Sequence, residues 1–77
     1  MLKQLIEYVV FKFVANKDHV SITETVSDDT IILKLQVAPE DLGKVIGKDG
    51  KTARYIRSLI SAAAFKEGKK AILEIVK

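Results

Sequence analysis

The hexapeptide Val45-Ile46-Gly47-Lys48-Asp49-Gly50 decides the fold, because it places two glycines around two charged residues between two helical patterns. Upstream, Pro39-Glu40-Asp41 is typical of a first helical turn, where proline is tolerated and acids suit the positive end of the dipole. Both upstream and downstream of the two glycines, apolar residues recur at helical spacing and would form one apolar helix face. These are Leu42, Val45 and Ile46 upstream, and Ala53, Ile56, Ile60 and Ala63 downstream. The sequence therefore predicts two helices joined by a four-residue connection.

The Gly47–Gly50 connection has a composition that suits a phosphate backbone. Glycine adopts backbone angles closed to other residues and lets another chain approach without a Cβ in the way. The start of the second helix presents free N–H groups and a partial positive charge, which favour a phosphate, and Lys48 adds a full charge. Asp49 repels phosphate, and we expect its carboxylate to cap the second helix. A polynucleotide backbone is thus a candidate ligand.

Positive charge is concentrated around this connection. From residue 44 to residue 57 there are five cations against one anion, Asp49, whereas the rest of the chain carries eight cations and nine anions. The formal net charge of +3 therefore belongs to one region. Such asymmetry is typical of a protein that binds a polyanion. The five cations are Lys44, Lys48, Lys51, Arg54 and Arg57.

The remaining chain predicts a helix, a hairpin and a final strand. Residues 2–15 carry an apolar helical stripe wider than one sheet face can cover. Residues 20–26 and 30–37 alternate with a period of two, which indicates a β-hairpin. In its second strand Ile31, Leu33, Leu35 and Val37 share one face. The helix after the connection is expected to end near Gly68, and residues 71–76 are predicted to form the last strand. The apolar stripe consists of Leu2, Ile6, Val9 and Phe13, widened by Leu5, Val10 and Val14.

Length and composition narrow the classes of function. A chain of 77 residues is expected to form one domain, residues 1–77, near the size at which a single core is marginal. It has no cysteine, so it has no disulfide and no thiolate metal site, which is compatible with a reducing cytosol. Charges at Lys3, Glu7 and Lys12 interrupt the apolar N-terminus too often for a signal peptide or a membrane span. We expect a soluble protein that is not exported and has no cofactor.

A nucleotide-binding P-loop is excluded by spacing. Gly47-Lys48 and Gly50-Lys51-Thr52 each look like the end of such a loop. The pattern requires a glycine five positions before the second one, where this chain has Leu42 and Val45 respectively. It also requires a preceding strand, and the sequence predicts a helix there.

No group of residues suggests catalysis. The paired acids Asp28-Asp29 and Glu40-Asp41 fall in a hairpin turn and in a first helical turn, where acids are expected for structural reasons. His19 is the only histidine, and with no cysteine it has no partner for a transition-metal site. We therefore predict a protein that is not an enzyme, with no catalytic residue and no metal site.

The segment Val45-Ile46-Gly47-x-x-Gly50 is similar to the signature of KH domains, RNA-binding modules whose GXXG loop clamps about four nucleotides by their backbone. With its continuation to Arg57 and its short length, the chain resembles the KhpA family of small stand-alone bacterial KH proteins over nearly all its residues. Ala53 departs from the pattern, since KH domains often have isoleucine there. The resemblance implies an α+β fold, a type II KH domain with the order α-β-β-α-α-β and three helices on one face of a three-stranded sheet.

The resemblance also implies an RNA site centred on the connection. Ile32 and Lys34 are secondary candidates, because the groove of a KH domain lies between this kind of strand and the GXXG helix pair. From the residues alone, they equally suit a solvated sheet face. The primary candidates are Lys44, Val45, Ile46, Gly47, Lys48, Asp49, Gly50, Lys51, Arg54 and Arg57. Since no stacking aromatic is expected near the groove, we predict an affinity for single-stranded RNA of roughly micromolar or weaker.

Two alternatives stay open. A degenerate GXXG loop would leave a protein-interaction or assembly module, and Asp49 and the broad first helix favour that interpretation. A backbone clamp would also accept single-stranded DNA. A homodimer, or a heterodimer with another KH-containing RNA-binding protein, would cover the broad apolar stripe of the first helix. The alanine-rich part of the helix after Gly50 is the alternative contact surface. The resemblance further implies a cytoplasmic RNA chaperone or post-transcriptional regulator linked to cell elongation.

Overall fold

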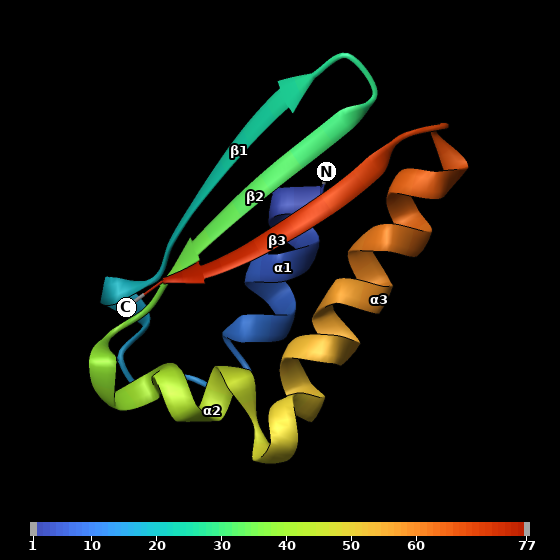
Figure 1. The fold of residues 1–77 in the computed structure, drawn as a ribbon. Helices are drawn as coiled ribbons and strands as arrows, with labels where there is room; N and C mark the ends of the chain where they lie inside the picture. The colour runs from blue at the N-terminus through green and yellow to red at the C-terminus, as the bar shows by residue number, and fades with distance from the viewer. Residues whose placement is uncertain (1, 77) are drawn as a thin grey trace.

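The protein has one layer of sheet and one layer of helices (Figure 1). The computed structural model describes residues 2–76. Short 3₁₀ turns at Lys17–His19, Pro39–Asp41 and Lys48–Gly50 connect the main elements. The order confirms the predicted α+β arrangement, α-β-β-α-α-β. The main elements are α1 (Leu2–Val10), β1 (Ser21–Ser27), β2 (Thr30–Gln36), α2 (Leu42–Ile46), α3 (Lys51–Lys66) and β3 (Lys70–Val76).

The sheet has the strand order β1-β2-β3. β1 and β2 pair antiparallel across a tight turn, with Ser27 opposite Thr30. β2 and β3 pair parallel, from Thr30 opposite Lys70 to Gln36 opposite Val76. Residues 37–69 therefore form a crossover that carries α2 and α3 from one strand to its neighbour. All three helices cover the same face of the sheet (Figure 1).

The core lies between that sheet face and the helices. Ile31, Leu33 and Leu35 alternate along β2, point towards the helices and are buried, as the sequence predicted. Fully burying an aliphatic side chain contributes about 1.5–3 kcal/mol, so this central strand is the main source of stability in the sheet. The helices contribute Leu2, Ile6, Val10, Val45, Ile56, Ile60 and Ala64 to the same cluster.

The first helix is shorter than the predicted range 2–15, because α1 ends at Val10. The N–H of Phe13 donates to the carbonyl of Val10, three residues back, so the last turn is tighter than an α-helix. This changes the angular position of the residues that follow. Val14 is buried as predicted, whereas Phe13 is 43% exposed, so its place on the buried stripe was wrong.

The faces of the helix pair also differ in detail from the prediction. Val45 is fully buried, but Ile46 is exposed, because α2 has only five residues and ends there. In α3 the fully buried residue near the end is Ala64, and Ala63 is only partly buried. Gly68, with φ 71°, follows the helix, and β3 begins at Lys70, one residue earlier than expected. In the part described, no helix is long and apolar enough to cross a membrane.

Candidate nucleic-acid interface

The Gly47–Gly50 connection reverses the chain between α2 and α3 with an unusual backbone. Gly47 has φ 78° and ψ 171°, Asp49 has φ 57° and Gly50 has φ 74°. The N–H of Gly47 donates to the carbonyl of Gly43 at 2.8 Å, which closes α2. The N–H of Gly50 donates to the carbonyl of Gly47 at 3.1 Å, which closes the connection. Three of its four residues thus lie in the positive φ region, where glycine is favoured.

The two glycines differ in how strictly the structure requires them. A Cβ at Gly47 would collide with the side chain of Thr52 and lie 2.8 Å from its backbone nitrogen. The angles of Gly47 also belong to a region that only glycine enters readily. A Cβ at Gly50 would meet nothing within 4 Å, and its left-handed helical angles are accessible to asparagine. Glycine is therefore favoured at position 47 by both packing and backbone angles, and at position 50 by backbone angles alone.

Asp49 does not cap α3, so that prediction was wrong. The N-cap position is occupied by Gly50, and no side chain makes a capping hydrogen bond there. Asp49 lies one residue too early for its short carboxylate to reach the free N–H groups of the first turn. Its backbone has a role instead, because the carbonyl of Asp49 accepts a hydrogen bond from Nη2 of Arg54. That bond connects the middle of the connection to α3.

The predicted cations surround the connection and are exposed. Lys48 lies within it, Lys51 and Arg54 belong to the first turn of α3, and Arg57 follows one turn later. Lys44 differs, because its Nζ lies 3.7 Å from Oδ1 of Asp41, which compensates part of its charge. Among residues 2–76 this is the single ion pair. The other four cations thus keep their charge available for an anionic ligand.

A shallow, open hollow of about 300 Å³ lies on the exposed side of α3, next to the connection. Lys51, Arg54, Tyr55 and Ser58 line it. The side chain of Tyr55 is 72% exposed. We expected no stacking aromatic near the site, and Tyr55 corrects that expectation. Its spacing of four residues from Lys51 was the available signal, since residues four apart share one helix face.

The structure does not bring Ile32 and Lys34 together with the connection. Both lie on the β2 face that points away from the helices, because their neighbours on the strand fill the core. In the sheet, Ile32 is paired with Ile72 and Lys34 with Glu74. Val45 is placed next to the connection but is fully buried, so it supports the connection from within. Of the predicted apolar contacts, Ile46 remains accessible.

Asp41 has a structural role that the sequence did not reveal. Its side chain is fully buried and accepts hydrogen bonds from the backbone N–H groups of Ala15, at 3.0 Å, and Asn16, at 2.9 Å. These bonds, helped by Lys44, hold the pKa of the carboxyl below its ordinary value although burial opposes the shift. The segment after α1 is thereby fastened to the start of α2. A partner 25 or 26 residues away leaves no local pattern, so sequence reasoning assigned Asp41 only to the helix dipole.

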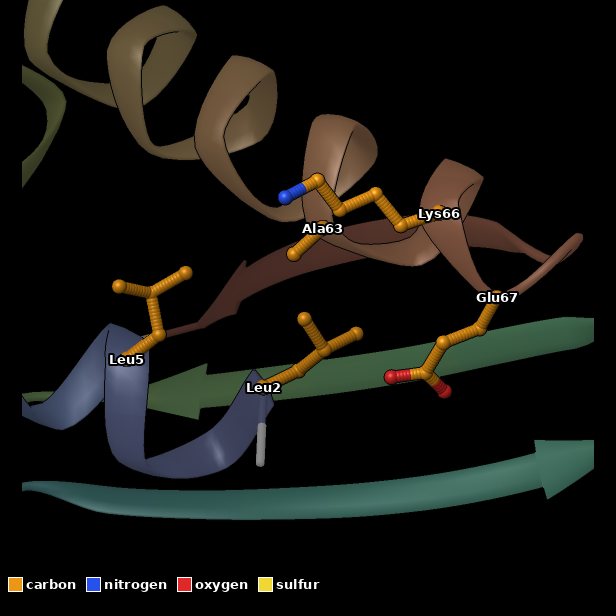
Figure 2. A pocket seen from close by; sticks show the side chains of 5 residues that line it. All are labelled: Leu2, Leu5, Ala63, Lys66 and Glu67. Atoms are coloured by element: carbon orange, nitrogen blue, oxygen red, sulfur yellow. The ribbon is translucent and has the colours of Figure 1, made fainter.

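A second hollow, of about 310 Å³, lies at the opposite end of α3. Figure 2 shows Leu2 and Leu5 of α1 facing Ala63 of α3 across it. Lys66 and Glu67 stand at its rim, so the charges there are balanced and do not suit a polyanion. Nor do the described residues contain a group of three His, Cys, Asp or Glu side chains that could hold a metal ion.

Comparison with known proteins gives a consistent result. A family model described as "KhpA/KhpB, KH domain" matches residues 3–75. The RNA-binding protein KhpA of Clostridium acetobutylicum is 48% identical over 75 residues, which cover 97% of this chain and all of that protein. Its namesakes from Clostridium perfringens and Aquifex aeolicus are 44% and 43% identical over 75 residues, 97% of this chain and 100% and 95% of those proteins. These names describe RNA-binding proteins and not enzymes.

Proposed function

This chain belongs to the KhpA/KhpB family of KH domains, and we propose that it binds single-stranded RNA by clamping about four nucleotides at the Gly47–Gly50 connection. The observation that carries the proposal is a connection closed to any side chain at Gly47 and surrounded by four exposed cations without an ion pair. The names of its relatives support the same ligand.

Each part of the connection has a role in the proposed clamp. Lys48 neutralises a phosphate, and the free N–H groups at the start of α3 favour a second one. Lys51 and Arg54 extend the positive surface along the helix. Ile46, exposed at the end of α2, offers an apolar contact to a sugar or a base. The charge of Asp49 opposes binding, which is consistent with an affinity of roughly micromolar or weaker.

Replacing the cation of the connection tests the proposal directly. Lys48→Asp should abolish RNA binding and leave the fold intact, because Lys48 is exposed and a surface charge change rarely affects stability by more than about 0.5 kcal/mol. The matched control is Lys17→Asp, which changes the net charge equally on the exposed turn after α1. Affinity is measured by fluorescence anisotropy, and circular dichroism reports the fold. Equal affinity of Lys48→Asp and the unmodified protein would refute the clamp.

Salt and sugar chemistry separate the alternatives. About three phosphate contacts should give a log–log salt slope of roughly −2. An apolar assembly module would show no such dependence. Competition between RNA and DNA oligonucleotides of the same sequence then decides the second alternative. Stronger competition by DNA would identify a single-stranded DNA binder instead.

We also propose that residues 1–77 form a single domain that associates as a homodimer, or with another KH-containing RNA-binding protein. The described part of α1 is largely packed in the core, so the surface involved is the apolar seam between α1 and α3 (Figure 2). Leu59, which is 45% exposed, shares a helix face with Ala63. In a two-fold arrangement, the opposite charges at the rim of the seam would pair between copies. The seam comprises Leu2, Leu5, Leu59 and Ala63, with Lys66 and Glu67 at its rim.

Sedimentation equilibrium at tens of micromolar protein tests this association. Leu59→Lys should give a monomeric mass, because a charge in an apolar contact is costly to bury. The control is Phe65→Ser, since Phe65 is 81% exposed and lies on another side of the helix. A monomeric mass for the unmodified protein, with undiminished binding of long RNA, would reject the association.

In the cell, we propose a cytoplasmic RNA chaperone or post-transcriptional regulator that affects cell elongation. A short clamp that holds backbone more than bases would bind many transcripts transiently, and a dimer would raise avidity for long RNA by presenting two connections. Crosslinking in cells, followed by sequencing of the recovered RNA, identifies the transcripts. Recovery that is equal for the unmodified protein and Lys48→Asp would contradict this role.

A further inference from the structure

The hollow on α3 combines three kinds of group that a nucleotide requires. It begins at Lys51, the residue directly after the connection, and continues about two turns along the helix to Ser58. Tyr55 presents an exposed aromatic face, and every base has a π-face that stacks on such a ring. Lys51 and Arg54 are cations suited to a phosphate, and the Ser58 hydroxyl both donates and accepts hydrogen bonds.

Arg54 connects this hollow physically to the proposed clamp. Its Nη2 donates to the carbonyl of Asp49, inside the connection, while the same side chain lines the hollow. A strand that leaves the connection along α3 would therefore meet Arg54 before it reaches Tyr55. The hollow is close in volume to the smallest ligand pockets, about 300 Å³, and it is open, so a polymer could pass through it.

Other exposed aromatic residues do not share these features. Phe65 lies at the far end of α3 and lines neither hollow, and the same holds for Phe11 and Phe13 after α1. The ring of Tyr8 is already covered by Nζ of Lys12, 4.7 Å from its centroid. A site for an apolar protein partner would be expected to have apolar side chains around its centre, whereas Tyr55 shares its hollow with two cations, Lys51 and Arg54. The charge favours an anionic chain.

We propose that Lys51, Arg54, Tyr55 and Ser58 form a second nucleotide site, in which a base of the bound RNA stacks on Tyr55 beyond the nucleotides held at the connection. This site rests on the proposed function, because the same strand occupies both. It extends the RNA footprint along α3 and adds a contact that is tolerant of base identity.

Oligonucleotide length isolates the contribution of the site. We compare an oligouridylate of about four nucleotides, the length a GXXG loop clamps, with forms extended by about three nucleotides at either end. One extended form should bind the unmodified protein about tenfold more tightly than the short one, and Tyr55→Ala should remove this gain without affecting the short form. Tyr55→Phe keeps the stacking face and should preserve the gain. Phe65→Ala is the control for loss of an exposed aromatic.

Two further measurements separate stacking from charge and from assembly. An extension built of abasic nucleotides keeps the phosphates but lacks the bases. If Tyr55 stacks on a base, such an extension should not increase the affinity. In a Tyr8→Phe background Tyr55 is the only tyrosine, and its fluorescence should be quenched by the extended RNA alone. Sedimentation of Tyr55→Ala must give the same mass as the unmodified protein. A lower mass together with weaker binding would place Tyr55 in a protein interface and reject the site.

The outcomes distinguish this site from the clamp itself. Equal effects of Tyr55→Ala on short and extended RNA, or no effect on either, would overturn the second site. Lys48→Asp should weaken both lengths. If it weakens neither, the proposed function fails first.

Discussion

The two ends of α2 are held in place by opposite means. At its start, the buried carboxylate of Asp41 accepts two backbone hydrogen bonds from the segment after α1. At its end, the connection keeps its shape through positive φ angles and the close approach of Gly47 to Thr52. The start of α2 is held by a side chain, and the charge of that side chain is already compensated, so it offers no group to a ligand. The end of α2 is held by backbone geometry, so the side chain of Lys48 stays exposed to solvent and can bind a ligand.

This difference separates stability from recognition within one short helix. A polar side chain that is buried and fully hydrogen-bonded fixes geometry, but its charge is already satisfied. Backbone geometry fixes a loop while its side chains remain in solvent. We therefore expect changes at the start of α2 to act on folding and changes at Lys48 to act on binding. Changes at Gly47 should act on both.

The largest effect is expected for Gly47→Ala. The new Cβ would lie 2.8 Å from the backbone nitrogen of Thr52 and would also require angles that only glycine enters readily. Strain and overpacking each cost about 1–3 kcal/mol, so we expect the free energy of unfolding to fall by about 2–4 kcal/mol. Urea denaturation measures it, and RNA affinity should fall as well.

A second substitution identifies which contact causes the loss of stability in Gly47→Ala. Thr52→Ala removes the colliding hydroxyl but leaves the Cβ and the backbone nitrogen of residue 52, both 2.8 Å from the new Cβ, in place. Combined with Gly47→Ala, it should restore only a part of the lost stability. Full restoration would show that the collision with the Thr52 hydroxyl, and not the backbone of the connection, makes glycine necessary.

Asp41→Asn is the next largest change, and it acts through pH. Hydrogen bonds from Ala15 and Asn16 hold the pKa of Asp41 below its ordinary value of 3.8. A group with a lowered pKa in the folded state stabilises the fold above its unfolded pKa, and this stabilisation is lost as pH falls through the folded pKa. The contribution of Asp41 should thus be complete at neutral pH and decline below about pH 4.

Thermal unfolding of the two proteins across this range measures the contribution. Asn keeps one acceptor oxygen but places an NH₂ group against the other N–H, so Asp41→Asn should melt at a lower temperature at pH 7. The difference in melting temperature should shrink as pH falls below about 4. A constant difference at all pH values would show that the ionised form of Asp41 does not provide the stabilisation. RNA affinity at neutral pH should be unaffected wherever the protein is folded.

A smaller effect is expected for Arg54→Met, which keeps the aliphatic length and removes the hydrogen bond to the carbonyl of Asp49. An exposed bond of this kind contributes about 0.5–1.5 kcal/mol, so stability should change little. RNA affinity should fall more than for the control Arg57→Met, because only Arg54 is bonded to the connection. Amide exchange at residues 48–50 should accelerate for Arg54→Met alone. Equal affinities for the two variants would mean that Arg54 acts only through its charge.

The smallest effect is expected for Gly50→Asn. Its Cβ would meet nothing within 4 Å, and asparagine tolerates the left-handed angles that Gly50 adopts. The free energy of unfolding should change by less than about 1 kcal/mol. A fall in the free energy of unfolding as large as that of Gly47→Ala would show that Gly47 and Gly50 are equally necessary.

Local patterns predicted the elements well and the long-range contacts poorly. Alternation along β2 placed Ile31, Leu33 and Leu35 correctly, because burial in a strand follows a period of two. The stripe of α1 failed at Phe13, since apolar spacing does not show where the hydrogen-bond pattern tightens. The two hydrogen bonds that Asp41 accepts from the segment after α1 had no local signal at all.

The site was predicted to a similar extent. The exposed cations could be identified from charge asymmetry, which needs no structure. Ile32 and Lys34 were selected by resemblance alone, and their strand is central, so its inward face is occupied by the core. The cap by Asp49 failed because a shift of one residue moves a side chain out of reach of the helix terminus. Tyr55 was missed although its spacing from Lys51 placed both on one exposed helix face, because only the cations of that face were considered as ligand contacts.

The parallel pairing of β2 with β3 sets an order of assembly. β1 and β2 are adjacent in sequence, so their hairpin closes a very short loop. β3 pairs with β2 only after residues 37–69 have brought it back, which costs more entropy and slows folding. The helix pair lies entirely within this returning segment. A ligand that bridges α2 and α3 would therefore shorten the search for the third strand, and pulse-labelled hydrogen exchange during refolding, with and without RNA, would show earlier protection of β3.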